Sequence, residues 1–413
     1  MNAPAETAAD SPVSSPQAIT KDRHRLVDGL RGVALLGIVI VNVEFILQHP
    51  NAGWRGDTST VDLVTQWFVT TFAVLKIYPL FALLFGYGLS VQLARVAQRG
   101  DTLGPRYARR MLGLVILGVL HAVLFFPGDI LVIYAAVGTI AYFLRRLSSS
   151  SLIRIAIVVY ATASVLWLMA GGALAIMDVP LDEPVSAESL AILTTGGFAD
   201  VIGYHLLTWP ATMLTLALVQ GPAAFACVLV GIALGRTDIL TNPGAYRGRA
   251  RRVLLIAGSA GLIGGAVGAT LSVNGGEFTA LGLMVGFAVA PALCAAYVSA
   301  LMLMWASLPQ FVSRLLQASG RMSLSVYLLQ SVVLSTLAFS YGAGLFGLLS
   351  PLAGVSLAVG VWIGLSLFAM LWLRFARFGP AEWMLRSLSC WRVQPMRDRN
   401  RDANSHTVRA DIG

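Results

Sequence analysis

The stretch from Leu26 to Phe45, LVDGLRGVALLGIVIVNVEF, is apolar along most of its length but carries Asp28 and Arg31 near its start and Asn42 and Glu44 near its end. Apolar residues continue beyond it, so the segment supplies the ~20 residues that a helix needs to cross ~30 Å of hydrocarbon. Polar groups within a span are costly unless they face a bundle interior or a wet cavity. The stretch therefore predicts both a membrane helix and a functional site.

The composition of the 413-residue chain is that of a polytopic membrane protein: 57% of residues are hydrophobic and 12% charged. Its mean hydropathy is +0.75, and a soluble domain would carry about a quarter charged residues. Cys227, Cys294 and Cys390 lie far apart without a CxxC motif or a nearby His, so we expect neither a disulfide framework nor a bound metal or other cofactor. The lipid bilayer is the expected partner.

Ten apolar segments alternate with clusters of Arg along the chain. Of 29 basic residues, only Arg55 and Lys76 fall on the side opposite these clusters. By the positive-inside rule this asymmetry places both termini in the cytoplasm, and it assigns the net charge of +9 to orientation and anionic lipid rather than to nucleic acid. The expected spans are residues 26–47, 77–94, 111–126, 130–144, 152–177, 210–234, 253–273, 278–305, 323–341 and 352–373.

The fold prediction is thus all-α, with about ten transmembrane helices in one domain over residues 21–386. We expect residues 1–20 to form a disordered cytoplasmic tail and residues 387–413 an Arg-rich cytoplasmic tail. Residues 61–73 are amphipathic, with Trp67 and Phe68, which predicts a helix at the membrane interface. We expect residues 178–208 to form the longest outer loop.

Asp28 and Arg31 are three residues apart, so their side chains share a helix face and can form an ion pair. Such a pair is either an interfacial anchor for the first helix or part of a site for an anionic ligand that enters from the cytoplasm. Both interpretations stay open from the sequence.

Three of the five histidines, His49, His121 and His205, map to the outer half. The segment GVLHAVLFFPGDIL places Asp129 across a short turn from His121. A carboxylate beside an imidazole fixes its tautomer and raises its basicity, as a general base requires. Asp129 can equally be only the N-cap of the following helix, and His121 only a structural hydrogen-bonding residue.

Polar residues form a stripe on one side of the ninth predicted span. The stripe consists of Ser323, Tyr327, Gln330 and Ser331. Its spacing suits either hydrogen bonds between helices or the lining of a pocket. The chain contains no nucleophile motif, Walker loop, dinucleotide fingerprint or HExxH.

Several of these segments resemble a known family. VDGLRGVALLGIVIVN, LFALLFGYG, GVLHAVLFFPGDIL, GRMSLSVYLLQS and FGPAEWMLRSLSCWRVQPM are similar to motifs of the bacterial YeiB family, and the resemblance covers essentially the whole chain. That family resembles the transmembrane acyltransferase superfamily. The resemblance implies a bacterial inner (plasma) membrane location and a multi-pass acyltransferase.

The first two helices also resemble the lysosomal heparan-α-glucosaminide N-acetyltransferase: RG, VN, a loop His before a Trp, and then TVDLV and WF. In that enzyme the Asn and the loop His form the catalytic pair, so the resemblance implies Asn42 and His49 here. The Asn-to-His loop is shorter in this chain. His121 with Asp129 is the more family-typical pair.

These features favour an acyltransferase that moves an acyl group from a cytoplasmic donor, acyl-CoA as co-substrate, to an envelope glycan, lipid or small-molecule acceptor on the outer face. The expected catalytic residues are His49, Asn42, His121 and Asp129. The expected donor-binding residues are Asp28, Arg31, Tyr327 and Gln330. The alternative is a transporter or lipid flippase without chemistry, and a homodimer is left open.

Overall fold

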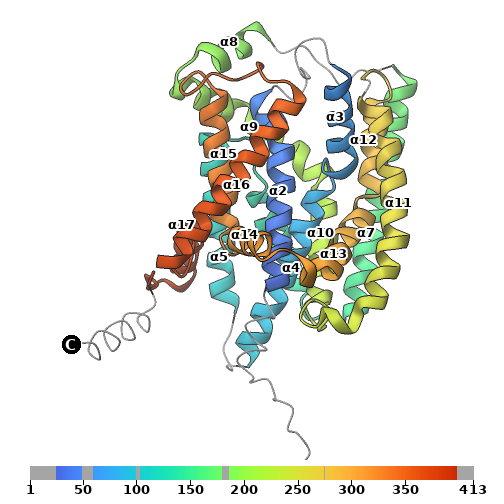
Figure 1. The fold of residues 1–413 in the computed structure, drawn as a ribbon, viewed down its shortest axis with the longest axis vertical. Helices are drawn as coiled ribbons and strands as arrows, with labels where there is room; N and C mark the ends of the chain where they lie inside the picture. The colour runs from blue at the N-terminus through green and yellow to red at the C-terminus, as the bar shows by residue number, and fades with distance from the viewer. Residues whose placement is uncertain (1–24, 49–58, 99–102, 179–185, 274, 398–413) are drawn as a thin grey trace, which may run out of the picture.

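The computed structural model describes residues 25–48, 59–98, 103–178, 186–273 and 275–397, and within these ranges the chain is helical without β-strands (Figure 1). The N-terminal tail predicted over residues 1–20 lies outside them, as do His49 and the end of the C-terminal tail. The longer helices are α2 (Arg25–Leu47), α4 (Ile77–Ala97), α5 (Gly104–Leu124), α7 (Ser149–Ile176), α9 (Phe198–Val219), α11 (Arg247–Val273), α15 (Ser323–Ala338) and α16 (Pro351–Phe375).

Shorter helices complete the bundle: α3 (Thr60–Phe72), α6 (Leu131–Leu144), α8 (Ala187–Thr195), α10 (Gly221–Leu234), α12 (Thr279–Ala288), α13 (Ala290–Met304), α14 (Gln310–Arg321) and α17 (Pro380–Cys390), with 3-10 turns η1 (Pro243–Tyr246) and η2 (Trp305–Ser307). We call the end where α2 begins and α4 ends the basic end, because the Arg clusters lie there, and the opposite end the far end.

Helix α2 is the centre of the bundle. In its most apolar stretch 67% of residues are buried, against 11% in the peripheral α9, and it packs against α4, α14, α15 and α16. Glycines allow backbones to touch it: a Cβ at Gly320 of α14 would lie 1.8 Å from the Asp28 carbonyl oxygen. Small residues at such crossings are how membrane helices approach closely.

The predicted all-helical membrane fold is confirmed. Within the described ranges, eight helical segments are long and apolar enough to cross a membrane, or nine if α14 and α15 count as one bent span. The predicted fourth span corresponds to α6, which has only 14 residues. Peripheral helices expose apolar side chains outward, such as Leu207 on α9 and Leu255 on α11, as a lipid-facing surface requires.

The prediction that residues 61–73 lie flat at the interface is wrong. Helix α3 stands upright in the bundle (Figure 1) and forms with α4 one apolar run over residues 60–97. The run is interrupted between the two helices, where Leu75 has a φ of 62°. Trp67 donates to Thr270 of α11 at 3.0 Å, so this residue of the predicted interfacial face bonds a neighbouring helix, while Phe68 stays exposed.

The predicted outer loop over residues 178–208 is too long. The predicted loop contains α8 and the start of α9, and the expected sixth span over residues 210–234 is divided between α9 and α10. The helix is interrupted at Gln220. Pro222 lies in the first turn of α10, where proline is tolerated because an amide there would have no intrahelical acceptor.

Helix α14 was not predicted as a separate element. It meets α15 at an angle of 89°, and the Glu382 carboxylate of α17 accepts the Leu324 amide at 2.7 Å and the Ser325 amide at 3.2 Å. Amides at a helix start have no intrahelical acceptor, so this side chain stabilises the bend.

The domain boundary predicted at residue 386 falls inside α17, and the predicted eighth span is interrupted at Val289.

Candidate functional site

Three buried polar side chains, from α5, from the turn that follows it and from α15, meet in the bundle interior. His121 Nδ1 lies 2.7 Å from Asp129 Oδ2, and the Tyr327 hydroxyl donates to the same oxygen at 3.2 Å. The exposed fractions are 4% for His121, 0% for Asp129 and 2% for Tyr327. The structure thus brings together two expected catalytic residues and one residue expected to bind the donor.

The turn between α5 and α6 positions the carboxylate. Asp129 Oδ1 accepts the Leu131 amide at 2.7 Å at the start of α6, while Oδ2 faces His121. One carboxylate oxygen of Asp129 therefore faces the imidazole and the other accepts the first amide of α6, whose N-cap residue is Ile130. A role of Asp129 in base catalysis stays a prediction. Gly118 leaves the space that the carboxylate needs, because a Cβ there would lie 2.7 Å from Asp129 Oδ1.

The second ring nitrogen of His121, Nε2, is the one that Asp129 does not contact. Because a carboxylate only accepts hydrogen bonds when ionised, Asp129 selects the tautomer with hydrogen on Nδ1, and the lone pair then lies on Nε2. His121 Nε2 is buried and has no hydrogen-bond partner among the described residues. Phe126 and Tyr327 surround the ring, with centroid separations of 6.5 and 5.2 Å.

The polar stripe of α15 joins helices. Tyr327 bonds Asp129, and Gln330 Nε2 donates to the Leu35 carbonyl of α2 at 3.3 Å. Gln330 Oε1 and Ser331 Oγ are buried without partners in the described part of the chain. We expected Tyr327 and Gln330 to bind the donor together with Asp28 and Arg31. The hydrogen bonds that they form are instead with Asp129 and with the Leu35 carbonyl.

Asn42 belongs to another set of hydrogen bonds. Its Oδ1 accepts the Tyr78 hydroxyl of α4 at 3.1 Å, and the Tyr134 hydroxyl of α6 donates to the Tyr78 carbonyl at 3.0 Å. These bonds tie α2, α4 and α6 together in the core. His49, the expected partner of Asn42, lies outside the described residues, so the pair stays a prediction.

The predicted ion pair at the start of α2 is present. Arg31 Nη1 lies 2.9 Å from Asp28 Oδ1, with side-chain exposures of 28% and 16%. A Cβ at Gly88 would lie 3.6 Å from Arg31 Nη2, so this guanidinium faces the middle of α4.

The prediction that His205 lies in an outer loop is wrong, because it lies in α9 and is 2% exposed. Its Nδ1 lies 3.2 Å from the Val123 carbonyl oxygen, two residues after His121. Both histidines therefore pack around the far end of α5, but only His121 contacts a carboxylate.

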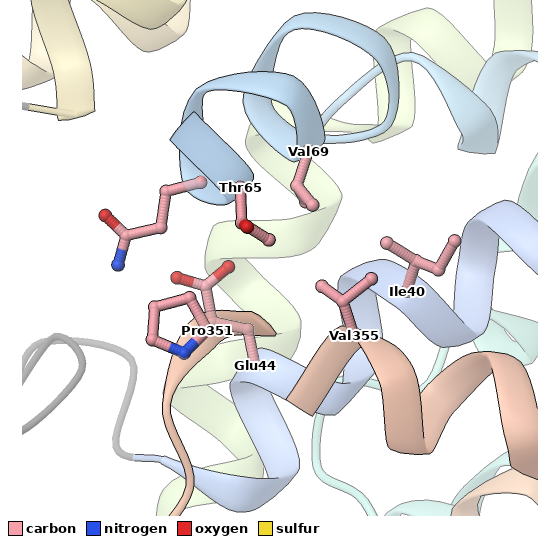
Figure 2. A pocket seen from close by; sticks show the side chains of 7 residues that line it. Ile40, Glu44, Thr65, Val69, Pro351 and Val355 are labelled. Carbon is pink, nitrogen blue, oxygen red and sulfur yellow. The ribbon is translucent and has the colours of Figure 1, made fainter. Parts of the chain in front are cut away.

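Glu44 lines a small hollow between α2, α3 and α16 (Figure 2). The picture shows its carboxylate beside Thr65 and Pro351. The space amounts to about 10 Å³, which is room for roughly one water molecule. Glu44, which the sequence marked as a polar residue within a span, therefore lines a water-sized pocket near the far end, apart from the His121 site.

Lys76 is a residue whose importance the sequence did not reveal. We placed it outside the membrane with Arg55, but its side chain is 1% exposed, and Nζ donates to the Thr70 carbonyl at 2.6 Å. A Cβ at Gly286 of α12 would lie 2.6 Å from Nζ. Lys76 thus lies between two interrupted helical runs, α3–α4 and α12–α13. The feature of the sequence that could have revealed Lys76 is its position as a single Lys in an apolar run.

Comparison with known proteins places this chain in a family. The model of a family described as "Protein of unknown function (DUF418)" matches residues 234–392. The chain is 30% identical over 395 residues to "Uncharacterized protein YeiB" of Escherichia coli (strain K12), covering 89% of this chain and 96% of that protein. It is 28% identical over 409 residues to "Uncharacterized protein YxaH" of Bacillus subtilis (strain 168), covering 92% and 97%.

The protein is therefore a multi-pass membrane protein, and it belongs to the YeiB-like family. The match extends over nearly the full length of these relatives. The predicted family membership is confirmed.

Proposed function

We propose that the protein is a membrane-embedded acyltransferase of the bacterial inner membrane, with its basic end in the cytoplasm. The observation that carries this proposal is the buried His121–Asp129 pair, in which His121 Nε2 has no hydrogen-bond partner among the described residues. A general base needs an available lone pair and an orienting partner on the other ring nitrogen. His121 has both.

In this proposal His121 Nε2 removes the proton from an acceptor hydroxyl or amine. The freed oxygen or nitrogen attacks the thioester carbonyl of acyl-CoA, the carbon–sulfur bond breaks, and the imidazolium returns its proton to the thiolate of coenzyme A. Asp129 stabilises the imidazolium without itself accepting the proton. Tyr327 orients Asp129 through its hydroxyl. Because His121 is 4% exposed, the acceptor must enter through a local opening of the bundle.

The direct test is transfer of label. Purified protein in detergent is incubated with acetyl-CoA labelled in the acetyl group and with an extract of envelope glycans and lipids. We expect label in an acceptor at a rate above that of protein-free controls. Free labelled acetate alone, or no consumption of acetyl-CoA with any extract, would contradict acyl transfer.

Proton-coupled transport is the second candidate, and Lys76 favours it. Interrupted helices that face one another around a buried ionisable group are the usual construction of carrier sites. Lys76 lies in the break between α3 and α4, and its Nζ lies against the Thr70 carbonyl of α3 and against Gly286 of α12, three residues before the break at Val289. Charge movement after a pH jump in reconstituted vesicles, lost in Lys76→Met and kept in His121→Gln, would favour transport over transfer.

A further inference from the structure

Two helical runs of the bundle are interrupted beside one another. Helix α3 leads through residues 73–76 into α4, and α12 leads through Val289 into α13. Both runs begin at the far end and continue toward the basic end (Figure 1), and α13 packs on α4. The C-terminal ends of α3 and α12 therefore lie next to each other inside the bundle.

The interruptions free backbone carbonyls from the helical hydrogen bonds. In a continuous helix the Val74 amide would bond the Thr70 carbonyl, but it bonds the Val69 carbonyl at 3.1 Å instead. The Phe287 carbonyl loses its helical partner because Pro291, four residues later, has no amide hydrogen. Carbonyls buried in this way need other donors.

Side chains supply these donors. The Tyr160 hydroxyl of α7 donates to the Phe287 carbonyl, and Lys76 Nζ donates to the Thr70 carbonyl at 2.6 Å. The first donor is a neutral hydroxyl, whereas the second belongs to a side chain that carries a positive charge when protonated. The two breaks thus differ in the charge of the group that satisfies them.

The ammonium of Lys76 lies at the ends of two helices. Thr70 is in the last turn of α3. Gly286 is in the last turn of α12, and its missing side chain allows the approach, because a Cβ there would lie 2.6 Å from Nζ. The C-terminal end of a helix carries roughly half a negative charge. Two such ends therefore face one positive charge.

This arrangement compensates a charge that burial makes costly. Lys76 is 1% exposed, and an ammonium away from water needs a partner of opposite sign. Within the described ranges, no Asp or Glu forms an ion pair with Lys76. The negative helix ends and the Thr70 carbonyl take the place of a carboxylate.

The groups around Nζ are those that hold a small cation in membrane carriers. Unwound carbonyls and the C-terminal ends of broken helices coordinate monovalent ions there, whereas calcium and magnesium sites usually include carboxylates. We propose that the C-terminal ends of α3 and α12 form a binding site for a monovalent cation, which the ammonium of Lys76 occupies in this structure. We call it the helix-end site, defined by Thr70 and Gly286. The site assumes neither acyl transfer nor transport, and its use in moving a cation rests on the second candidate function.

The test removes the tethered cation and supplies a free one. Lys76→Ala deletes the ammonium and leaves its volume empty, whereas Lys76→Met, the matched control, fills that volume with an uncharged chain. Both variants are purified in the presence of ammonium chloride. The melting temperature Tm is then measured in detergent at one pH and one ionic strength, while choline chloride is replaced stepwise by sodium, potassium, ammonium or methylammonium chloride.

We expect at least one small cation to raise the Tm of Lys76→Ala saturably, by about 2–4 °C, because a ligand that binds only the folded state stabilises it by mass action. The wild-type protein and Lys76→Met should shift by less than about 1 °C, because their sites are filled. Equal shifts in all three proteins, or no shift in Lys76→Ala, would overturn the proposal.

A second variant covers the case in which Lys76→Ala does not give a single peak in size-exclusion chromatography. Lys76→Ser keeps a hydroxyl and also leaves space, and it is measured in the same way. If neither variant folds in any of the four cations while Lys76→Met does, no small cation replaces the ammonium and the proposal is overturned. Folding that requires one of these cations supports it.

Stability is the readout, so the outcome is separate from both candidate functions. Cation-dependent stability of Lys76→Ala in a protein whose wild type moves no charge keeps the helix-end site and contradicts transport. Charge movement by the wild type without this cation dependence contradicts the site alone.

Discussion

His121 Nδ1 meets Asp129 Oδ2 at 2.7 Å, although the end of α5 and a turn separate the two residues in the chain. The same carboxylate accepts the Leu131 amide of α6 and the Tyr327 hydroxyl of α15. One side chain therefore connects three helices and orients the imidazole. Whatever displaces Asp129 should affect the reactivity of His121 as well as the stability of the bundle.

Tyr327→Phe tests the orienting role of the hydroxyl. It removes the hydrogen bond to Asp129 and a longer one that the hydroxyl accepts from the Ile130 amide, so we expect a stability loss of about 1–2 kcal/mol and a transfer rate lowered by up to about tenfold. Tyr134→Phe is the matched control, because it removes a buried hydroxyl bond to the Tyr78 carbonyl. Thermal unfolding should show similar losses of stability in the two variants, whereas only Tyr327→Phe should lower the transfer rate. Equal rates in the two variants would contradict this role.

Gly118→Ala tests the space beside Asp129. The new Cβ would lie 2.7 Å from Asp129 Oδ1 and 2.9 Å from Val132 Cγ2, so we expect a loss of about 1–3 kcal/mol through overpacking. Gly172→Ala of α7 has no neighbour within 4 Å and should be neutral or slightly stabilising. Thermal unfolding in detergent measures both. A stable Gly118→Ala protein would show that the carboxylate has room to move.

The contact between Lys76 and Gly286 can be measured by a double-mutant cycle. Gly286→Ala places a Cβ 2.6 Å from Lys76 Nζ, so it should destabilise the protein. In a Lys76→Ala background the steric conflict is absent and most of the penalty should vanish, with a coupling of about 0.5–3 kcal/mol between the two positions. Additive losses in the free energy of unfolding would mean that the two residues do not touch.

The orientation of the bundle predicts different labelling from the two sides. In a variant without native cysteines, Ser186→Cys before α8 should react with an impermeant maleimide added to intact cells. Arg251→Cys at the start of α11 should react only after the cells are opened. Both native side chains are exposed. Equal labelling in intact cells would contradict the topology.

Much of this architecture follows from local sequence. The apolar run and the rim polar residues identified α2, and a two-residue Pro–Gly turn was enough to bring Asp129 near His121. The Asp28–Arg31 pair follows from helical spacing alone. In each case the interacting groups lie within a few residues, so local geometry determines the contact.

The remaining contacts depend on tertiary packing. Tyr327 reaches Asp129 across 198 residues of chain, and its position in a polar stripe did not specify a partner. The upright packing of α3, the burial of Lys76 and the placement of His205 in α9 result from neighbours that sequence pattern does not identify. The bend before α15 depends on Glu382, a carboxylate 58 residues away from Leu324.

The most direct test of the account compares the transfer rates of His121→Gln and His205→Gln. Both variants replace a buried histidine near the far end of α5, but only His121 pairs with Asp129. Loss of a general base lowers rates about 10²–10⁴-fold, so His121→Gln should lose transfer by that amount at normal protein levels, whereas His205→Gln should retain most of it. Full transfer by His121→Gln would contradict the proposed role of the His121–Asp129 pair.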